Sequence, residues 1–304
     1  MCWTLEALIL FCSLPVLAFG VPDNSPGNFD GARAYEHVRH LVEIGPRPPA
    51  SEGIRRAQSY IIGQLKSFGC PVEEHDFHGL TPLGNLAMKN IVVKIPGTNP
   101  SIVLYSTHYD TVRIPNFVGA DDGGSGVGTM LELARTFCSR KNSLNVCIVF
   151  FDGEETQNNW TDAASVQWSD NNATFGSREL AAQMALSGHL KRVKAMILTD
   201  MVGPANLNIK RDTNSTTWLT DLIWATAAQL GYQYVFVNDK TTVSDDHLSF
   251  IRRGVAGCDL IDFSVKDTYW HTPQDTLDKV DPKSLAIVGQ VLAATLPRFE
   301  KKFR

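Results

Sequence analysis

The sequence contains no cluster of basic residues. Its 28 Lys and Arg residues are balanced by 32 Asp and Glu residues, and the net charge is -4. Proteins that bind nucleic acid through its phosphates present a concentrated basic surface. We therefore expect no nucleic-acid partner.

Internal repeats, low-complexity tracts and long linkers are also missing. A chain of 304 residues with 43% hydrophobic and 20% charged residues can form one large domain or two small ones. Since no linker marks a boundary between two domains, we expect a single domain over residues 21–304.

Cysteine is scarce, and its spacing excludes a cysteine-rich zinc site. None of the six cysteines forms a C-x-x-C pair. Cys138 and Cys147 flank a short loop and could pair in an oxidising compartment, or they could be free and buried. The sequence leaves both alternatives open.

The first twenty residues differ in kind from the rest of the chain. The apolar run "LEALILFCSLPVLAFG" is too short to span a bilayer comfortably, and it ends with small residues at positions 18 and 20. These features predict a cleaved signal peptide over residues 1–20, a secreted or periplasmic protein and no stable membrane anchor. Residues 1–6 lack Lys and Arg, so the alternative is a misassigned start codon.

Apolar runs alternate with helical patterns along the remaining chain. Continuously apolar segments at 90–97, 101–110, 145–155, 195–203 and 258–265 predict strands that are covered on both faces. Segments with helical spacing lie at 31–44, 52–69, 127–137, 177–186, 218–230 and 282–302. This alternation predicts an α/β fold with a mostly parallel sheet.

Acidic and imidazole side chains follow the predicted strands. In open α/β sheets, ligands bind outside the carboxyl ends of the strands, so these residues are expected to meet at one edge. They are His108, Asp110, Glu154, Glu155, Asp200 and, in the loop after the last strand, His271.

Two short motifs strengthen this prediction. In "GADDGGSG", glycines after Asp121 and Asp122 allow a tight turn that projects a carboxylate into a cleft, although an aspartate helix cap is the alternative. Glu154 and Glu155 are neighbours at a strand end and point to different sides, so one can bind a metal while the other faces a substrate.

The motifs "STHYD", "GADDGGSG", "FFDGEE", "LTDMVG" and "WHTPQDT", in this order, resemble the zinc aminopeptidases with paired metals. Glutaminyl cyclases share the same fold. The resemblance extends from about residue 32 to the C-terminus and implies a three-layer α/β/α fold with a central mixed, mostly parallel twisted sheet. It also implies a set of metal ligands, namely His108, Asp122, Glu155, Asp200 and His271, in which the Asp122 carboxylate bridges two metal ions. In the same resemblance, Glu154 is the catalytic base and Asp110 orients the His108 ring.

Further segments resemble the glutaminyl cyclases in particular. These are "NFVGA", "GEETQNNW", "FGSREL", "SDDHLSFIRRGV" and Trp270 directly before His271. The resemblance implies a peptide or protein substrate with an N-terminal glutamine, apolar walls from Trp160 and Trp270, and a catalytic Asp245 hydrogen-bonded to Asp200. It favours one zinc, on Asp122, Glu155 and His271, over two, with His108 and Asp200 holding the second.

Other features of the sequence resemble the aminopeptidases more than the animal cyclases. "DDGGSG" and "HTPQDT" resemble the peptidases, and Thr107 and Gly126 stand where animal cyclases have a disulfide. A bacterial or divergent cyclase is therefore favoured over an animal one. The alternatives are a zinc aminopeptidase with one or two metals and a non-catalytic binding protein of the same fold.

Three further histidines are not expected to bind the metal. Residues 75–85 contain His75 and His78, and we interpret this segment as a loop or strand edge. His247, inside the "SDDH" motif, is expected to support ligands rather than to be one.

Overall fold

The computed structural model describes residues 29–160, 165–169 and 171–304. The signal peptide predicted for residues 1–20 lies outside these residues. Within them, no helix combines the length and the apolarity that crossing a membrane requires.

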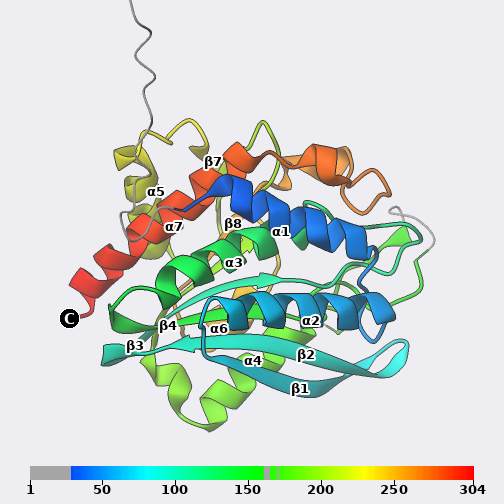
Figure 1. Ribbon diagram of the computed structural model, residues 1–304, viewed down its shortest axis with the longest axis horizontal. Helices are drawn as coiled ribbons and strands as arrows, with labels where there is room; N and C mark the ends of the chain where they lie inside the picture. Colours follow the sequence, from blue (N-terminus) through cyan, green and yellow to red (C-terminus); the bar gives the residue numbers. More distant parts are fainter. Residues whose placement is uncertain (1–28, 161–164, 170) are drawn as a thin grey trace, which may run out of the picture.

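A twisted sheet of six strands forms the centre of the molecule, in the order β1-β2-β4-β3-β5-β8 (Figure 1). The strands β4, β3, β5 and β8 are parallel to one another, whereas β1 and β2 are antiparallel to their neighbours. Their bounds are β1 (Val72–Thr81), β2 (Gly84–Ile95), β3 (Gly97–His108), β4 (Asn142–Phe151), β5 (Val193–Asp200) and β8 (Gly257–Ile261).

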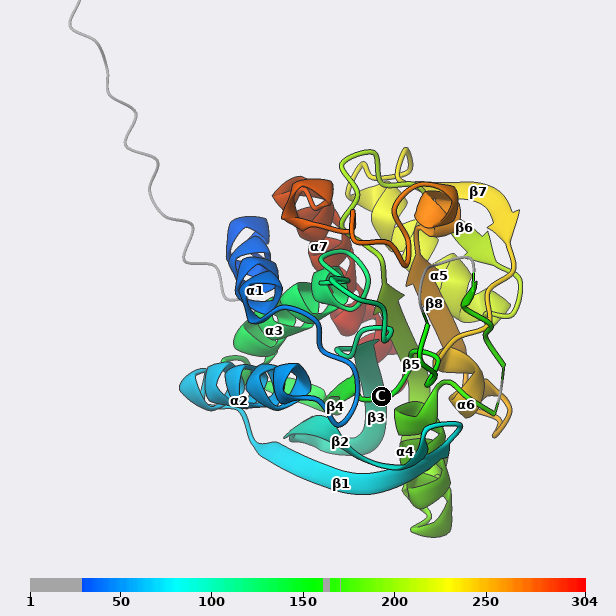
Figure 2. The same ribbon diagram turned by 90° about the vertical axis from the view of Figure 1, so that its right-hand side faces the viewer.

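Helices cover both faces of this sheet (Figures 1 and 2). On one face pack α1 (Gly31–Ile44), α2 (Glu52–Ser67), α3 (Gly124–Cys138), α5 (Thr217–Gln229) and α7 (Pro282–Lys302). The other face carries α4 (Phe175–Leu186) and the short α6 (His247–Ile251). The predicted three-layer α/β/α fold with a mixed, mostly parallel sheet is confirmed.

Burial on both faces explains the continuous apolar runs of the central strands. Successive side chains of a strand point to opposite faces. In β3, Val103 and Tyr105 belong to the larger core under α3 and α7, whereas Leu104 belongs to the smaller core under α4. A strand in this position has no solvent-exposed face, so a polar residue there has no access to water.

Of the two interpretations of segment 75–85, a loop or a strand edge, the structure shows the second, because the segment forms part of a β-hairpin whose strand β1 is at the edge of the sheet. Strand β1 pairs with β2 over the whole of Val72–Thr81, and the turn lies between Thr81 and Gly84. The pattern was missed because half of the residues of β1 are exposed and its first half carries the charged residues Glu73, Glu74 and Asp76. A second, small sheet of β6 (Ile209–Asp212) and β7 (Phe236–Thr241) was also not predicted.

Cys138 pairs with Cys70 and not with Cys147, so a Cys138–Cys147 disulfide is wrong. Cys138 ends α3 on the side of the larger core, where Cys70 also lies. Cys147 points from β4 to the opposite face of the sheet, into the smaller core. The two residues are close in sequence but separated by the sheet, and Cys147 and Cys258 are free and buried.

Removing this disulfide is expected to lower the stability of the fold. Cys70 and Cys138 are 68 residues apart, and closing a loop of that size in the unfolded chain contributes about 4 kcal/mol in the chain-entropy description. A C70S/C138S variant should therefore unfold at clearly lower denaturant concentration than the wild type, measured by circular dichroism. Adding a reductant should lower the midpoint of the wild type and leave that of the variant unchanged.

Candidate metal centre and active-site cavity

The carboxyl ends of β3 and β4 are joined by one carboxylate. Asp110, two residues after β3, accepts hydrogen bonds from the backbone amides of Glu154 and Glu155, at 3.1 and 3.2 Å. Its Oδ1 also lies 3.6 Å from Nδ1 of His108. Asp110 therefore fixes the strand end that carries the two glutamates, and it faces the ring that the sequence analysis expected it to orient.

The loop before α3 places Asp121 and Asp122 with their backbones tied to the C-terminal part of the chain. The Asp275 carboxylate accepts from both of their amides, at 2.8 and 3.0 Å. Gly123 follows with φ +74, and a Cβ there would lie 2.7 Å from the Asp110 carbonyl oxygen. Only glycine fits this close approach in a left-handed conformation.

Asp121 and Asp122 have different surroundings. The Asp121 carboxylate accepts from the Gly203 amide and from the Tyr269 hydroxyl, at 2.9 and 2.8 Å, so it ties three segments together. Asp122 instead points toward two imidazoles, those of His108 and His271, each 3.3 Å away.

His271 is held in a strained backbone conformation with φ +55, which non-glycine residues seldom adopt. Its ring stacks on the indole of Trp270, with the ring centroids 3.9 Å apart, and meets the edge of Phe117. These aromatic contacts fix the direction of the imidazole.

Five predicted ligand residues form two groups that share Asp122. In the first, Nε2 of His271 lies 3.3 Å from Asp122 and 3.1 Å from Glu155. In the second, Nε2 of His108 lies 3.3 Å from Asp122 and 3.1 Å from Asp200. All five residues are buried.

Two carboxylates dominate the electrostatics of the first group. Burial alone would lower the pKa of His271, but the Glu155 and Asp122 carboxylates outweigh it and raise this pKa to about 10. Burial and the charge of Asp122 raise the pKa of Glu155 to about 7. The two carboxylates therefore favour a positive charge between them.

These residues fit a metal ion. Each group offers one imidazole nitrogen and two carboxylate oxygens, a donor set that suits Zn²⁺ with a position left open for chemistry. Asp122 Oδ2 and Glu155 Oε1 are buried without a hydrogen-bond partner among the described residues. Buried carboxylate oxygens are rarely left in this state unless they hold an ion.

A cavity of about 290 Å³ opens onto this cluster. Its walls include Glu154 and the apolar side chains of Met201, Val243, Ile261 and Phe263. Asp122, Glu155, Asp200, Asp245, Trp270 and His271 also line it.

Glu154 and Asp245 both line this cavity. Burial, and then the nearby charge of Asp245, raises the pKa of Glu154 well above its usual value. Burial and the charge of Asp200 do the same for the pKa of Asp245. Each of these neighbouring carboxylates therefore opposes the ionisation of the others.

The structure separates the two predicted tryptophans. Trp270 lines the cavity, but Trp160 is not among the lining residues; it packs on Val112, Ile114 and Phe117, and its Nε1 donates to Thr156. Among the described residues, Trp168 lines the cavity instead. Spacing from the "GEE" motif could not find this, because neither Trp160 nor Trp168 lies in a helix or strand whose period would set the direction of the side chain.

The expected hydrogen bond between Asp245 and Asp200 is not present in the described part of the chain. Oδ1 of Asp245 instead accepts from the Asp246 amide at 2.5 Å. His247 lies outside both ligand groups, with Nε2 3.2 Å from the Asp212 carboxylate.

Arg47 is a fully buried residue behind the site that the sequence did not indicate. Its guanidinium donates to the carbonyl oxygens of Tyr109, Val118 and Gly119, at 3.1, 2.6 and 2.9 Å, and so holds the loop that leads to Asp122. Burial lowers the pKa of Arg47 to about 10, and the charges of Asp275, Asp122 and Asp110 oppose this effect. The "GPRPP" segment signalled only a helix end.

Replacing Arg47 with Met is expected to destabilise the protein by about 3–5 kcal/mol, because several buried carbonyls lose their donor and the carboxylates lose a counter-charge. The matched control is Arg55→Met on α2, whose side chain is 59% exposed. That change should stay within about 0.5 kcal/mol. Urea denaturation of both variants measures the difference, and equal midpoints would contradict the role of Arg47.

Comparison with known proteins identifies the family of the chain. The model of peptidase family M28 matches residues 90–296. The glutaminyl-peptide cyclotransferase of Bothrops jararaca is 28% identical over 301 residues, which are 86% of this chain and 79% of the relative.

Solved structures agree with this result. The glutaminyl cyclase of an Acidobacteriales bacterium superposes with a TM-score of 0.83 at 35% identity, over 92% of this chain and 98% of that one. A Zn-dependent exopeptidase from Parabacteroides distasonis superposes with a TM-score of 0.79 at 27% identity, over 88% and 98%. The chain therefore belongs to peptidase family M28 and, within it, to the glutaminyl cyclases.

Proposed function

We propose that this protein is a zinc-dependent glutaminyl-peptide cyclotransferase, which converts the N-terminal glutamine of peptides to pyroglutamate and releases ammonia. The observation that carries the proposal is the convergence of Asp122, Glu155 and His271 at one cavity that also contains Glu154 and Trp270. The names of its relatives support the same reaction.

Asp122, Glu155 and His271 would hold the zinc. When bound, the ion supplies Lewis-acid polarisation of the γ-amide oxygen of the substrate. His108 and Asp200 could hold a second ion together with Asp122. One zinc per chain is the favoured count.

Glu154 is proposed as the catalytic base and acid. In the reaction, the α-amine nitrogen bonds to the side-chain amide carbon, and the bond from that carbon to the amide nitrogen breaks. Glu154 takes a proton from the amine and returns it to the departing ammonia, so no proton is gained or lost overall. The raised pKa of its carboxyl suits a group that must carry a proton between these two positions.

Asp245 and Asp200 are proposed to assist the leaving group. Both line the cavity next to Glu154, and a protonated carboxyl among them can donate a hydrogen bond to the amide nitrogen. Without a direct hydrogen bond between Asp245 and Asp200, the two act from separate segments, the turn before α6 and the end of β5, rather than as one rigid pair.

The apolar walls hold the glutamine chain folded and limit water. Trp270 supplies one wall and fixes the His271 ring at the same time. Trp168 takes the wall position that we expected for Trp160, and Trp160 instead supports Phe117, which contacts His271. Holding the amine against the amide carbon supplies much of the rate through proximity, and a dry pocket suppresses competing hydrolysis.

An aminopeptidase is the second candidate, because both ligand groups could hold a metal pair. The purified protein should be incubated with a glutamine-initiated peptide and, separately, with leucine-p-nitroanilide. Ammonia release from the peptide supports the cyclase. Chromogen release alone would assign a peptidase, and no reaction with either would favour a binding protein.

We also propose that the protein is exported, because residues 1–20 have the features of a cleaved signal peptide. The expected outcome is that mature protein secreted from its host, or isolated from the periplasm, begins at or near Val21. N-terminal sequencing checks this, and a mature chain that still contains residues 1–20 would contradict it.

A further inference from the structure

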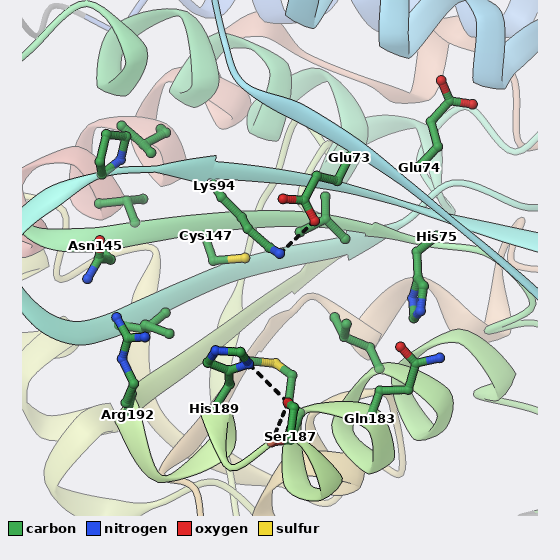
Figure 3. A pocket seen from close by; sticks show the side chains of 17 residues that line it. Glu73, Glu74, His75, Lys94, Asn145, Cys147, Gln183, Ser187, His189 and Arg192 are labelled. Carbon is green, nitrogen blue, oxygen red and sulfur yellow. Dashed lines mark hydrogen bonds and ion pairs between the residues drawn. The ribbon is translucent and has the colours of Figure 1, made fainter.

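A second cavity, of about 440 Å³, lies between the sheet and α4, on the face opposite α3 (Figure 3). It shares no lining residue with the active-site cavity. Its volume lies in the range of small-molecule sites, which are mostly apolar with a few polar groups that orient the ligand.

The floor of this second cavity is apolar and continuous with the smaller core. Val92, Cys147 and Leu180 are buried, and Ile102 and Met184 pack partly buried against the same core. Water over such a floor is displaced favourably by an aliphatic group, at about 25 cal/mol for each Å² covered.

The charged side chains around the opening are mostly paired with one another. Lys94 lies 2.6 Å from Glu73, and Lys89, just outside the cavity, lies 2.5 Å from Glu74. These two ion pairs neutralise the acidic residues that line the cavity.

Arg192 is the exception. Its Nε donates to the Pro100 carbonyl at 2.7 Å, but no ion pair joins it to a carboxylate within the described ranges. The two terminal guanidinium nitrogens are left for a ligand. Figure 3 shows Arg192 and His189 on the same wall, and the His189 ring is itself held by Ser187 at 3.0 Å.

We propose that this cavity binds a small single-chain carboxylate, with its head at Arg192 and its aliphatic body on the floor formed by Val92, Ile102, Cys147, Leu180 and Met184. A guanidinium with two free nitrogens accepts a carboxylate in a bidentate pair. A neutral ligand would leave the charge of Arg192 unmatched, and a dianion would bring a second charge that Arg192 alone does not match. The site is independent of the proposed cyclisation.

The test uses decanoate as the probe and titration calorimetry on the full-length mature protein, below the concentration at which decanoate forms micelles. One saturable site per chain is expected. Arg192→Gln should weaken binding about tenfold, the loss of one charge-assisted pair. Lys191→Gln removes the same charge from the neighbouring residue, which does not line the cavity, and should change nothing.

Further measurements test the charged head and the apolar body of the ligand separately. Decanol, which lacks the charge, should bind about tenfold more weakly than decanoate to the wild type and equally to Arg192→Gln. Met184→Gln should weaken decanoate binding several-fold, whereas Leu186→Gln, on the same helix but 90% exposed and outside the cavity, should not.

Several results would overturn the proposal. They are no saturable binding, equal binding by Arg192→Gln and Lys191→Gln, and competitive inhibition of turnover by decanoate, which would put it in the active-site cavity. Tighter binding of an acetylated tri-leucine peptide with a free carboxylate would assign the cavity to a peptide C-terminus instead.

Discussion

Replacing Glu154 with Gln is expected to lower kcat by about 10²- to 10⁴-fold while the zinc content stays the same. Gln has nearly the same shape but cannot take a proton from the amine and return it to ammonia. Glu154 belongs to neither group of candidate metal ligands, so the ion should remain. Ammonia release from a glutamine-initiated peptide measures kcat, and elemental analysis after dialysis measures zinc.

The matched control is Glu155→Gln, one residue along the chain. Glu155 lies 3.1 Å from His271 within the proposed zinc group, so this variant should lose the metal together with the activity. If Glu154→Gln loses zinc and Glu155→Gln keeps it, the roles of the two glutamates are the reverse of those proposed. An active Glu154→Gln variant would remove Glu154 from the mechanism.

Replacing His271 with Gln is expected to abolish zinc binding at micromolar protein concentration. The imidazole is the only nitrogen donor of its group, and two buried carboxylates remain without it. Loss of an outer-shell partner alone weakens metal affinity about 10- to 100-fold, and loss of a direct ligand should exceed that. Zinc per chain should fall from about one to near zero by elemental analysis, with the circular dichroism spectrum unchanged.

His108→Gln provides the comparison and tests the count. If one zinc is held by Asp122, Glu155 and His271, the variant should keep about one ion per chain. A fall from two ions to one on replacing His108 would show a metal pair and shift the proposed function toward a peptidase. Loss of all zinc in His108→Gln would contradict the independence of the two groups.

The sequence was a good guide to the parts of the site that depend on the sheet. His108, Glu155 and Asp200 sit at the ends of β3, β4 and β5, and parallel neighbours bring their carboxyl ends to one edge. Any arrangement that keeps these strands adjacent brings the three side chains together. The strands themselves were recognisable because burial on both faces leaves an uninterrupted apolar run.

Features that depend on irregular segments could not be predicted in the same way. The position of Trp160 depends on the path of a loop, and the Cys70–Cys138 bond depends on two helices packing on one side of the sheet. Arg47 and Asp275 act through hydrogen bonds to backbone atoms, which have no signature in the sequence. The exposed, charged strand β1 lacked the apolar pattern by which the others were found.

The Asp275 carboxylate accepts hydrogen bonds from the amides of Asp121 and Asp122, which precede it by 154 and 153 residues in the sequence. The ligand group of Asp122, Glu155 and His271 can therefore form only after the C-terminal segment that contains His271 and Asp275 has been synthesised.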